Sequence, residues 1–181
     1  MRIHWHRQDL RMADNPALVG RDIGVESEGS SAEAPVVGLF VFDPDVLDNA
    51  APPRLSFMLD ALDSLRSAYS DRGGELLVAR GDPETVIPDI AEALDADLVT
   101  WAANYSGLSR ERDAVVRQAL VDVGVDRHAE HQSVHHKPGT ITTNKGDPYK
   151  AFTDFSKKWY DRPKEQPATH SREADLATAN A

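Results

Sequence analysis

The stretch VVGLFVF, Val36–Phe42, contains no polar side chain. A short run of this kind is typical of a strand that is covered on both faces, as strands of parallel sheets are. Comparable strand candidates recur at regular intervals along the chain, at Arg2–His6, Glu75–Ala79, Asp97–Ala102 and roughly Val125–His131.

Apolar residues at helical spacing lie between these strands. They form three stripes: Leu55, Met58, Leu62, Leu65 and Tyr69; Ile87, Ile90, Ala91 and Leu94; Val116, Ala119, Leu120 and Val123. Asn15-Pro16 and Asp82-Pro83 are typical helix starts, and Gly73-Gly74 and Gly124 are typical helix ends. This alternation predicts an α/β fold, a five-stranded parallel sheet with helices on both faces (Rossmann-like).

Composition limits the classes of function. A chain of 181 residues is most simply one domain, and its net charge of −10 argues against a general nucleic-acid surface. Asp and Arg are favoured over Lys, which indicates a salt-adapted protein. The absence of cysteine excludes disulfides, Cys metal sites and a Cys nucleophile. The sequence shows no signal peptide and no membrane span, so we expect a soluble, cytoplasmic protein.

The loops after the strands carry no G-x-G-x-x-G motif and no P-loop, so ordinary dinucleotide and nucleoside-triphosphate sites are disfavoured. Gly81-Asp82-Pro83 is interpreted as a capped turn rather than a phosphate cradle. Arg54 follows Pro52-Pro53 in a first helical turn, where the helix dipole disfavours a cation. Two explanations for a cation at this position stay open. The first is a nearby anionic or π-rich ligand. The second is that Arg54 is solvated, or pairs with Asp43 or Asp48.

Two further groups of residues have open interpretations. His128, His131, His135 and His136 lack a regular ligand spacing, so we predict no metal site. Tyr149, Phe152, Phe155 and Trp159 form one apolar helical stripe, typical of a core or docking surface and less often of an electron-transfer chain. Gly24–Pro35 is predicted to be a mobile loop, and Arg162–Ala181 a flexible linker or tail.

The stretch WHRQDLRMADNPAL, Trp5–Leu18, resembles the amino-terminal signature of the DNA photolyase/cryptochrome family. The similarity continues in order through GLFVFDPDVL, APPRLSFMLDALDSLR, GDPETVIPDIAEAL, YSGLSRERDAVVRQAL and KPGTITTNKGDPYKAFTDFSKKW. The resemblance implies that residues 1–161 form the family's α/β antenna domain. In the family a larger helical domain follows, which holds the catalytic FAD, the damaged-DNA pocket and the tryptophan electron path.

Because this sequence stops before such a domain, we expect a natural fragment or truncated form without the helical FAD domain and with no catalytic residues of its own. Contact with damaged DNA would come only through that domain. Arg7, Asp9, Arg11 and Asp14 are predicted to fix the turn after the first strand by mutual pairing and to face the helical domain. Phe152, Phe155 and Trp159 are predicted to dock near the domain junction, and to promote self-association when exposed.

The resemblance also implies an antenna pigment in this domain: a deazaflavin, a folate or a flavin. Phe40, Val41 and Phe42 would line an apolar slot between His6 and Asn104, and Arg54 would stand beside it. Asn104 and Ser106 would form the rim of this cleft. Deazaflavin-binding relatives resemble D-x-E where this chain has Asn104-Tyr105-Ser106, and folate-binding relatives have Asn-Glu at Leu108-Ser109. We therefore expect weak retention of a deazaflavin or flavin, and no bound folate.

The function predicted from this resemblance is a light-harvesting domain of a deoxyribodipyrimidine photolyase. One alternative is a cryptochrome-like blue-light signalling module. A weaker one is a nucleotide-binding α/β protein of the universal-stress type, which the absence of a glycine-rich phosphate loop disfavours.

Overall fold

Five parallel strands form the centre of the molecule, a computed structural model that describes residues 1–20, 34–164, 166–167 and 175–180. In chain order the strands are β1 (Arg2–His6), β2 (Val36–Phe42), β3 (Leu76–Arg80), β4 (Leu98–Ala102) and β5 (Asp126–Glu130). Their order in the sheet is β3-β2-β1-β4-β5, and every adjacent pair is parallel. The strand predictions are confirmed to within one residue at each end.

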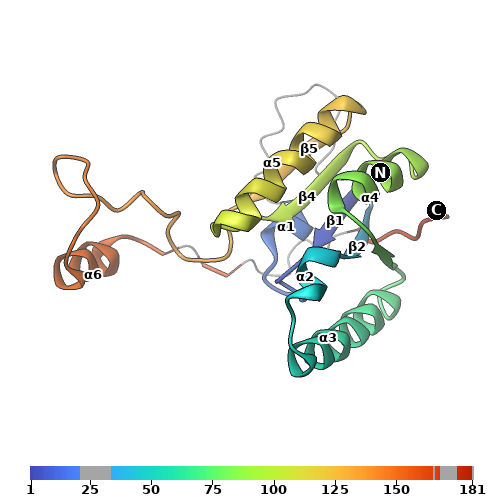
Figure 1. Ribbon diagram of the computed structural model, residues 1–181, viewed down its shortest axis with the longest axis horizontal. Helices are drawn as coiled ribbons and strands as arrows, with labels where there is room; N and C mark the ends of the chain where they lie inside the picture. Colours follow the sequence, from blue (N-terminus) through green and yellow to red (C-terminus); the bar gives the residue numbers. More distant parts are fainter. Residues whose placement is uncertain (21–33, 165, 168–174, 181) are drawn as a thin grey trace.

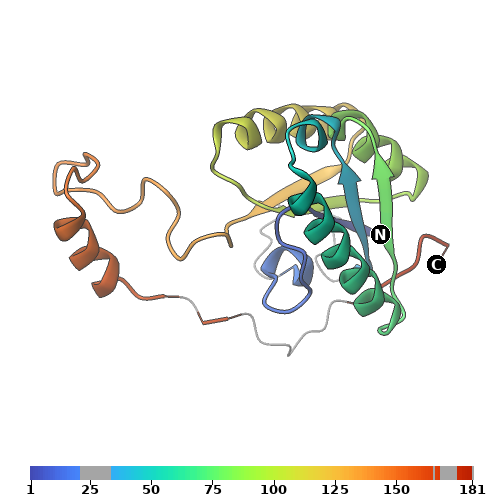
Figure 2. The same ribbon diagram turned by 60° about the horizontal axis from the view of Figure 1, so that its bottom comes forward.

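Helices cover both faces of this sheet, which confirms the predicted fold class (Figures 1 and 2). They are α1 (Pro16–Val19), α2 (Pro44–Asp48), α3 (Pro52–Ser70), α4 (Pro83–Ala93), α5 (Gly107–Asp122) and α6 (Phe152–Asp161). Helices α4 and α5 pack on one face, and α1 and α3 on the other. The short helix α2 was not predicted, because five residues are too few to show an apolar period.

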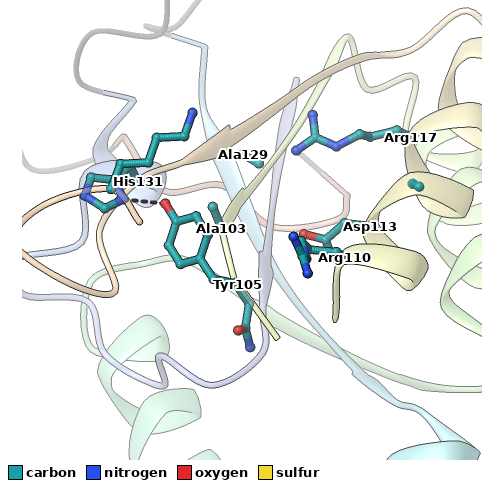
Figure 3. Close-up of a pocket in the computed structure, with 10 residues that line it drawn as sticks. Ala103, Tyr105, Arg110, Asp113, Arg117, Ala129 and His131 are labelled. Atoms are coloured by element: carbon teal, nitrogen blue, oxygen red, sulfur yellow. Dashed lines mark hydrogen bonds between the residues drawn. The ribbon is translucent and has the colours of Figure 1, made fainter. Parts of the chain in front are cut away.

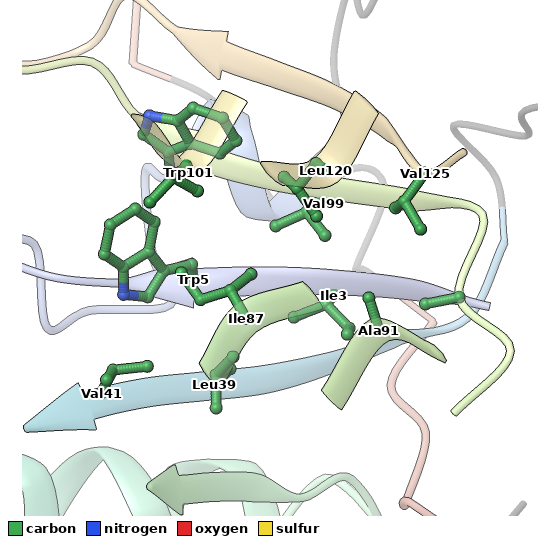
Figure 4. Close-up of a cluster of buried hydrophobic side chains, with 12 residues drawn as sticks. Ile3, Trp5, Leu39, Val41, Ile87, Ala91, Val99, Trp101, Leu120 and Val125 are labelled. Atoms are coloured by element: carbon green, nitrogen blue, oxygen red, sulfur yellow. The ribbon is translucent and has the colours of Figure 1, made fainter. Parts of the chain in front are cut away.

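The face under α4 and α5 has an apolar core (Figure 4). Ile3 and Trp5 of β1 contribute to it because alternate side chains of a strand point to the same face. The Trp5 and Trp101 rings meet edge to face, with centroids 5.9 Å apart. From the helices above, Ile87 and Leu120 complete the packing, as the predicted stripes require.

The opposite face is covered mainly by α3, through the predicted residues Leu62, Leu65 and Tyr69. The Tyr69 ring lies directly over Gly38 of β2. A β-carbon at position 38 would lie 2.7 Å from Cζ of Tyr69, closer than real β-carbon contacts allow. Glycine at this position therefore permits the aromatic side chain to reach the sheet.

Residues 175–180 lie in the segment that was predicted to be a flexible tail. In the structure they pack against the amino ends of β2 and β3. The amide of Val36 donates to Asp175 O at 2.7 Å, and Ala177 N donates to Val36 O at 3.0 Å. Leu176 packs against the α3 core and against Gly74, where a β-carbon would meet its own at 2.6 Å. The loop predicted over Gly24–Pro35 lies almost entirely outside the described residues.

Helix α6 stands away from the sheet and its helices, at the far end of an extended segment (Figures 1 and 2). None of its residues is buried. Within the described part of the chain, no helix is long and apolar enough to cross a membrane. The same residues contain no group of three or more potential metal ligands.

Candidate functional site

The strand order reverses at β1, so the carboxyl ends of β1 and β4 flank the position where open α/β sheets bind ligands. Arg7 occupies this position, directly after β1. Its guanidinium donates to the Ala102 carbonyl at the end of β4 and forms an ion pair with Asp113 of α5. The Arg7 side chain thus links the carboxyl end of β1 to that of β4.

The Asp113 carboxylate accepts hydrogen bonds from more than one donor beneath α5. Trp101 Nε1 donates to its Oδ2 at 3.1 Å, and the Arg7 guanidinium lies over the Trp5 ring at 4.6 Å. Burial lowers the pKa of Arg7, and the charge of Asp113 opposes this lowering. A second ion pair, Arg112–Asp43 at 2.8 Å, ties α5 to the end of β2. The Asp43 carboxylate is therefore occupied by Arg112 and not by Arg54.

The turn after β1 is held by three of its four predicted charged residues. Arg11 Nε pairs with Asp9 at 2.9 Å, and Arg11 Nη2 lies 3.6 Å from the Asp14 carboxylate. Gln132, which follows the edge strand β5, donates to Asp9 at 2.8 Å. It therefore connects this turn to the β5 edge of the sheet. Arg7 does not take part, because its side chain turns beneath α5 toward Asp113.

His6 does not bound a cleft, because its side chain is buried on the α3 face of the sheet. Its Nδ1 lies 3.0 Å from the Asp9 carbonyl, which can only accept, so Nδ1 carries the proton. Nε2 then accepts from the Tyr69 hydroxyl at 2.8 Å. Burial lowers the pKa of His6 to about 4, and the imidazole is neutral at pH 7.

His4 belongs to the same buried polar cluster. The Thr100 hydroxyl donates to Ala17 O at 2.9 Å and accepts from His4 Nδ1 at 3.1 Å. Asn15 Nδ2 lies 3.3 Å from the remaining nitrogen of His4. Burial is also the main cause that lowers the pKa of His4, and the neighbouring His6 adds to it. These histidines are structural, and sequence reasoning missed the cluster because its partners lie far apart in the chain.

A pocket of about 290 Å³ opens at the carboxyl ends of β4 and β5, beside α5 (Figure 3). Its lining includes Asn104, Tyr105, Arg110, Asp113, Arg117, His131 and Lys137. Tyr105 and His131 lie on one side of it, and Arg110 and Arg117 on the other. Sequence reasoning assigned only Asn104 to a ligand. The signal that was available is the spacing of 110, 113 and 117, which places these residues on one face of a helix.

Tyr105 and His131 interact through the phenol oxygen and Nδ1. Burial raises the pKa of Tyr105, and the charge of Glu130 raises it further. Glu130 itself bonds His128 Nε2 at 2.9 Å and the amide of His131 at 2.9 Å. The pocket wall is thus made of a neutral phenol and an imidazole held in place by the end of β5.

The three residues predicted to line one apolar slot are divided between the two faces of the sheet. Phe40 and Phe42 pack edge to face at 5.1 Å on the α3 side, and Val41 lies in the core under α4. This division follows from the alternation of side chains along a strand. Arg54 is exposed in the first turn of α3 and makes no ion pair with any described residue.

Asn104 and Ser106 both have local roles at the start of α5. Asn104 Oδ1 accepts from the amide of Ser106 at 3.1 Å, and Ser106 caps the helix by accepting from Ser109 N at 3.3 Å. Asn104 also lines the pocket, and Ser106 does not. The two residues are therefore close in space, but only one of them faces the cavity.

The apolar stripe of α6 is exposed for much of its area. Phe152 is 77% exposed, and Phe155 lies against Phe152 and Tyr149. Trp159 contacts the rings of His135 and His136, each at 5.7 Å. The helix begins at Phe152, so Tyr149 precedes it rather than belonging to it as predicted.

Comparison with known proteins identifies the family. A family model described as DNA photolyase matches residues 2–173. The chain belongs to the DNA photolyase family. It is 49% identical over 182 aligned residues to a deoxyribodipyrimidine photo-lyase of Halobacterium salinarum, an alignment that covers 100% of this chain and 38% of that protein. The source of this relative agrees with the salt-adapted composition.

Relatives in the family include photolyases and cryptochromes. A cryptochrome DASH of Natronomonas pharaonis is 32% identical over 161 residues, which cover 85% of this chain and 32% of that protein. A class III photolyase of Agrobacterium tumefaciens superimposes with a TM-score of 0.76 at 27% identity, over 93% of this chain and 33% of that one. The chain thus spans about a third of the length of these relatives.

The fold is shared with more distant members as well. An archaeal photolyase of Sulfolobus tokodaii, whose structure contains two FAD molecules, superimposes with a TM-score of 0.79 at 22% identity. The superposition covers 98% of this chain and 38% of that one. At this identity the likeness establishes the α/β fold of the family and not the ligand of this chain.

Proposed function

We propose that this chain acts as the light-harvesting domain of a deoxyribodipyrimidine photolyase, and that it holds an antenna pigment at the carboxyl edge of its sheet. The observation that carries the proposal is the family match over residues 2–173. The sheet topology supports it, because the strand order reverses at β1 and Asn104 follows the neighbouring strand β4 at that edge.

The residues present fit such a pigment in part. Arg54, which makes no ion pair among the described residues, and half-exposed Asn104 offer a cation and an amide to a flavin or deazaflavin ring. Asn104 Oδ1 already accepts from Ser106 N, and neither position supplies a carboxylate. We therefore propose weak retention of a flavin or deazaflavin. Folate is disfavoured, because Leu108 has no polar group and Ser109 is buried against the Ser106 cap.

In a longer protein, the pigment would absorb light and pass the excitation energy to FAD in a helical domain, where damaged DNA would be repaired. The contribution of this chain is then to bind and orient the pigment and to dock on that domain, with Phe152, Phe155 and Trp159 as the proposed contact. Repair is favoured over cryptochrome-like signalling by the 49% identity to a photolyase against 32% to a cryptochrome.

Titration of the purified chain with riboflavin and with a deazaflavin, followed by pigment fluorescence, tests the proposal. We expect weak binding that the combined Arg54→Ala and Asn104→Ala substitutions abolish. Arg66→Ala, at an exposed position on α3, is the matched control and should leave binding unchanged. Tight binding that survives the double substitution would place the pigment elsewhere, and no binding of either compound would contradict the proposal.

A further inference from the structure

The amino end of β2 extends beyond that of β3, and a segment from the end of the chain lies beside it. The pairing of the two strands starts with Gly38 of β2 opposite Leu76 of β3, whereas β2 itself starts at Val36. Residues 175–179, which we call the strap, run parallel to β2 at this place, with Leu176 opposite Val36. The strap thus covers a stretch of strand edge that β3 leaves open.

Four backbone amides hold the strap against the sheet. Val36 N donates to Asp175 O at 2.7 Å, and Ala177 N donates to Val36 O at 3.0 Å. Glu75 N donates to Ala177 O at 3.1 Å, and Glu75 Oε2 accepts from Ala179 N at 2.9 Å. These bonds involve only the amino ends of β2 and β3, so they can break while the rest of the sheet stays paired.

One apolar side chain anchors the strap on the α3 side of the sheet. Leu176 is half-buried against the cluster that contains Leu65 and Tyr69. Gly74, just before β3, makes room for it, since a β-carbon at position 74 would lie 2.6 Å from the β-carbon of Leu176. That atom is bonded to the strap backbone, so no change of rotamer relieves the clash. An alanine at position 74 would therefore displace the strap itself.

The strap is one of two attachments of the connection that carries α6. This connection, residues 131–174, leaves the sheet after β5 and returns to it at the strap. Helix α6 and the strap lie at opposite ends of the molecule (Figures 1 and 2). Side chains of α6 contact residues of the same connection: Trp159 meets the ring of His135, and Lys158 donates to the Thr142 carbonyl. The reach of α6 therefore depends on where the connection is attached.

We propose that the strap is a detachable tether that controls how far α6 can reach. With the strap docked, the connection is held both at the carboxyl end of β5 and at the amino end of β2. With the strap released, α6 is held at one end only and has access to a larger volume. A partner that binds α6 beyond the reach of the docked state must supply the free energy of release, so the strap lowers its apparent affinity. The inference concerns the mobility of the chain and does not rest on the proposed pigment.

Amide hydrogen exchange of the full chain, followed by NMR, tests the release. In the wild type, protection factors should be at least about 10-fold below that of Leu39, in the middle of β2, at the four amides that hold the strap: Val36, Glu75, Ala177 and Ala179. Gly74→Ala should lower these four by a further factor of about 10 or more, while Leu39 stays strongly protected. Leu176→Ser weakens the same contact from the strap side and should act in the same direction. Circular dichroism should show both variants folded.

The matched control is Gly107→Ala, at the start of α5, where an added β-carbon meets no atom within 4 Å. It should leave the exchange of the strap amides unchanged.

Backbone nitrogen relaxation of α6 tests the tether. Both strap variants should lower the heteronuclear NOE of the α6 amides, because the helix is then held at one end only, and Gly107→Ala should not. Three results would each overturn the proposal. The first is strap amides that exchange only as slowly as Leu39 in the wild type. The second is strap protection that neither Gly74→Ala nor Leu176→Ser lowers. The third is faster strap exchange without any change in the relaxation of α6.

Discussion

Arg7, at the end of β1, and Asp113, in the middle of α5, form an ion pair whose side chains are 7% and 8% exposed. The pair joins the central strand to the helix that covers it. Since the Ala102 carbonyl and the Trp101 indole also bond to it, both charges have hydrogen-bond partners in a site that water barely reaches. The carboxyl end of the sheet is therefore fixed by a polar contact within an otherwise apolar layer.

Asp113→Asn should destabilise the fold, because it leaves the Arg7 guanidinium buried without a counter-charge. Breaking a buried pair on one side costs about 3 kcal/mol or more. Urea unfolding followed by circular dichroism measures this loss. Asp122→Asn, at an exposed position near the end of the same helix, should change the free energy of unfolding little. Equal effects of the two substitutions would contradict the role assigned to the pair.

Acid should destabilise the protein between about pH 6.5 and 4 through its buried histidines. The pKa of His6 falls from 6.5 to about 4 on folding, because burial disfavours the charged imidazole. The unfolded chain then binds more protons than the folded one, so stability is lost as the pH falls through this window. At pH 4 the loss from His6 is about 3 kcal/mol, and His4 acts in the same direction.

His6→Gln isolates this contribution, because glutamine can still accept from Tyr69 and donate to the Asp9 carbonyl. The variant should show a shallower dependence of unfolding free energy on pH between 6.5 and 4. Denaturant titrations of both proteins across that range supply the measurement. An unchanged slope would show that other groups, such as carboxylates, dominate the acid response.

The exposed side of α6 should drive self-association. Phe152 and Tyr160 are 77% and 72% exposed, on a helix without a buried residue. Sedimentation velocity at rising concentration should show association that Phe155→Glu weakens. Thr153→Glu adds the same charge at an exposed position outside the apolar stripe, and serves as the control. A wild-type chain that stays monomeric at every concentration would contradict this prediction.

The chain by itself should show no light-driven repair of pyrimidine dimers. By family resemblance, the catalytic FAD and the lesion pocket belong to a helical domain, and the structure described here is the α/β domain. Blue-light illumination of purified protein with dimer-containing DNA, followed by a dimer-specific antibody or nuclease assay, measures the activity. Dimer reversal by this chain alone would contradict the prediction.

The fold could be predicted because its signals are local. The apolar run of β2 and the stripes of α3 and α4 each lie within one stretch of sequence, and so do the caps. Strand β1 shows the limit of this approach. Its alternation of Arg2, His4 and His6 with Ile3 and Trp5 is the pattern of a half-exposed strand, but all five residues are buried. The polar partners of His4 and His6 lie on β4, on α3 and in the turn between β1 and α1.

The candidate site was harder to predict, for the same reason. The partner of Arg7 is 106 residues away, so grouping it with Asp9, Arg11 and Asp14 was the natural interpretation from sequence. The prediction that Phe40, Val41 and Phe42 line one slot was wrong, because successive side chains of a strand point to opposite faces of the sheet. Val41 therefore lies on the other face from Phe40 and Phe42. The pocket beside α5 is lined by residues that follow β4, by residues of α5, and by residues of β5 and the segment after it. These parts of the chain come together only when it folds.

The docking of residues 175–180 beside Val36 has a practical consequence for handling the molecule. The N-terminal amine pairs with Asp97 at 2.8 Å, just before β4, so both described ends of the chain are attached to the amino-terminal rim of the sheet. The pocket opens at the opposite rim. A tag or surface linkage placed after residue 180 would therefore immobilise the protein with its binding edge turned toward the solution, which makes it well suited to sensor-chip measurements with small ligands.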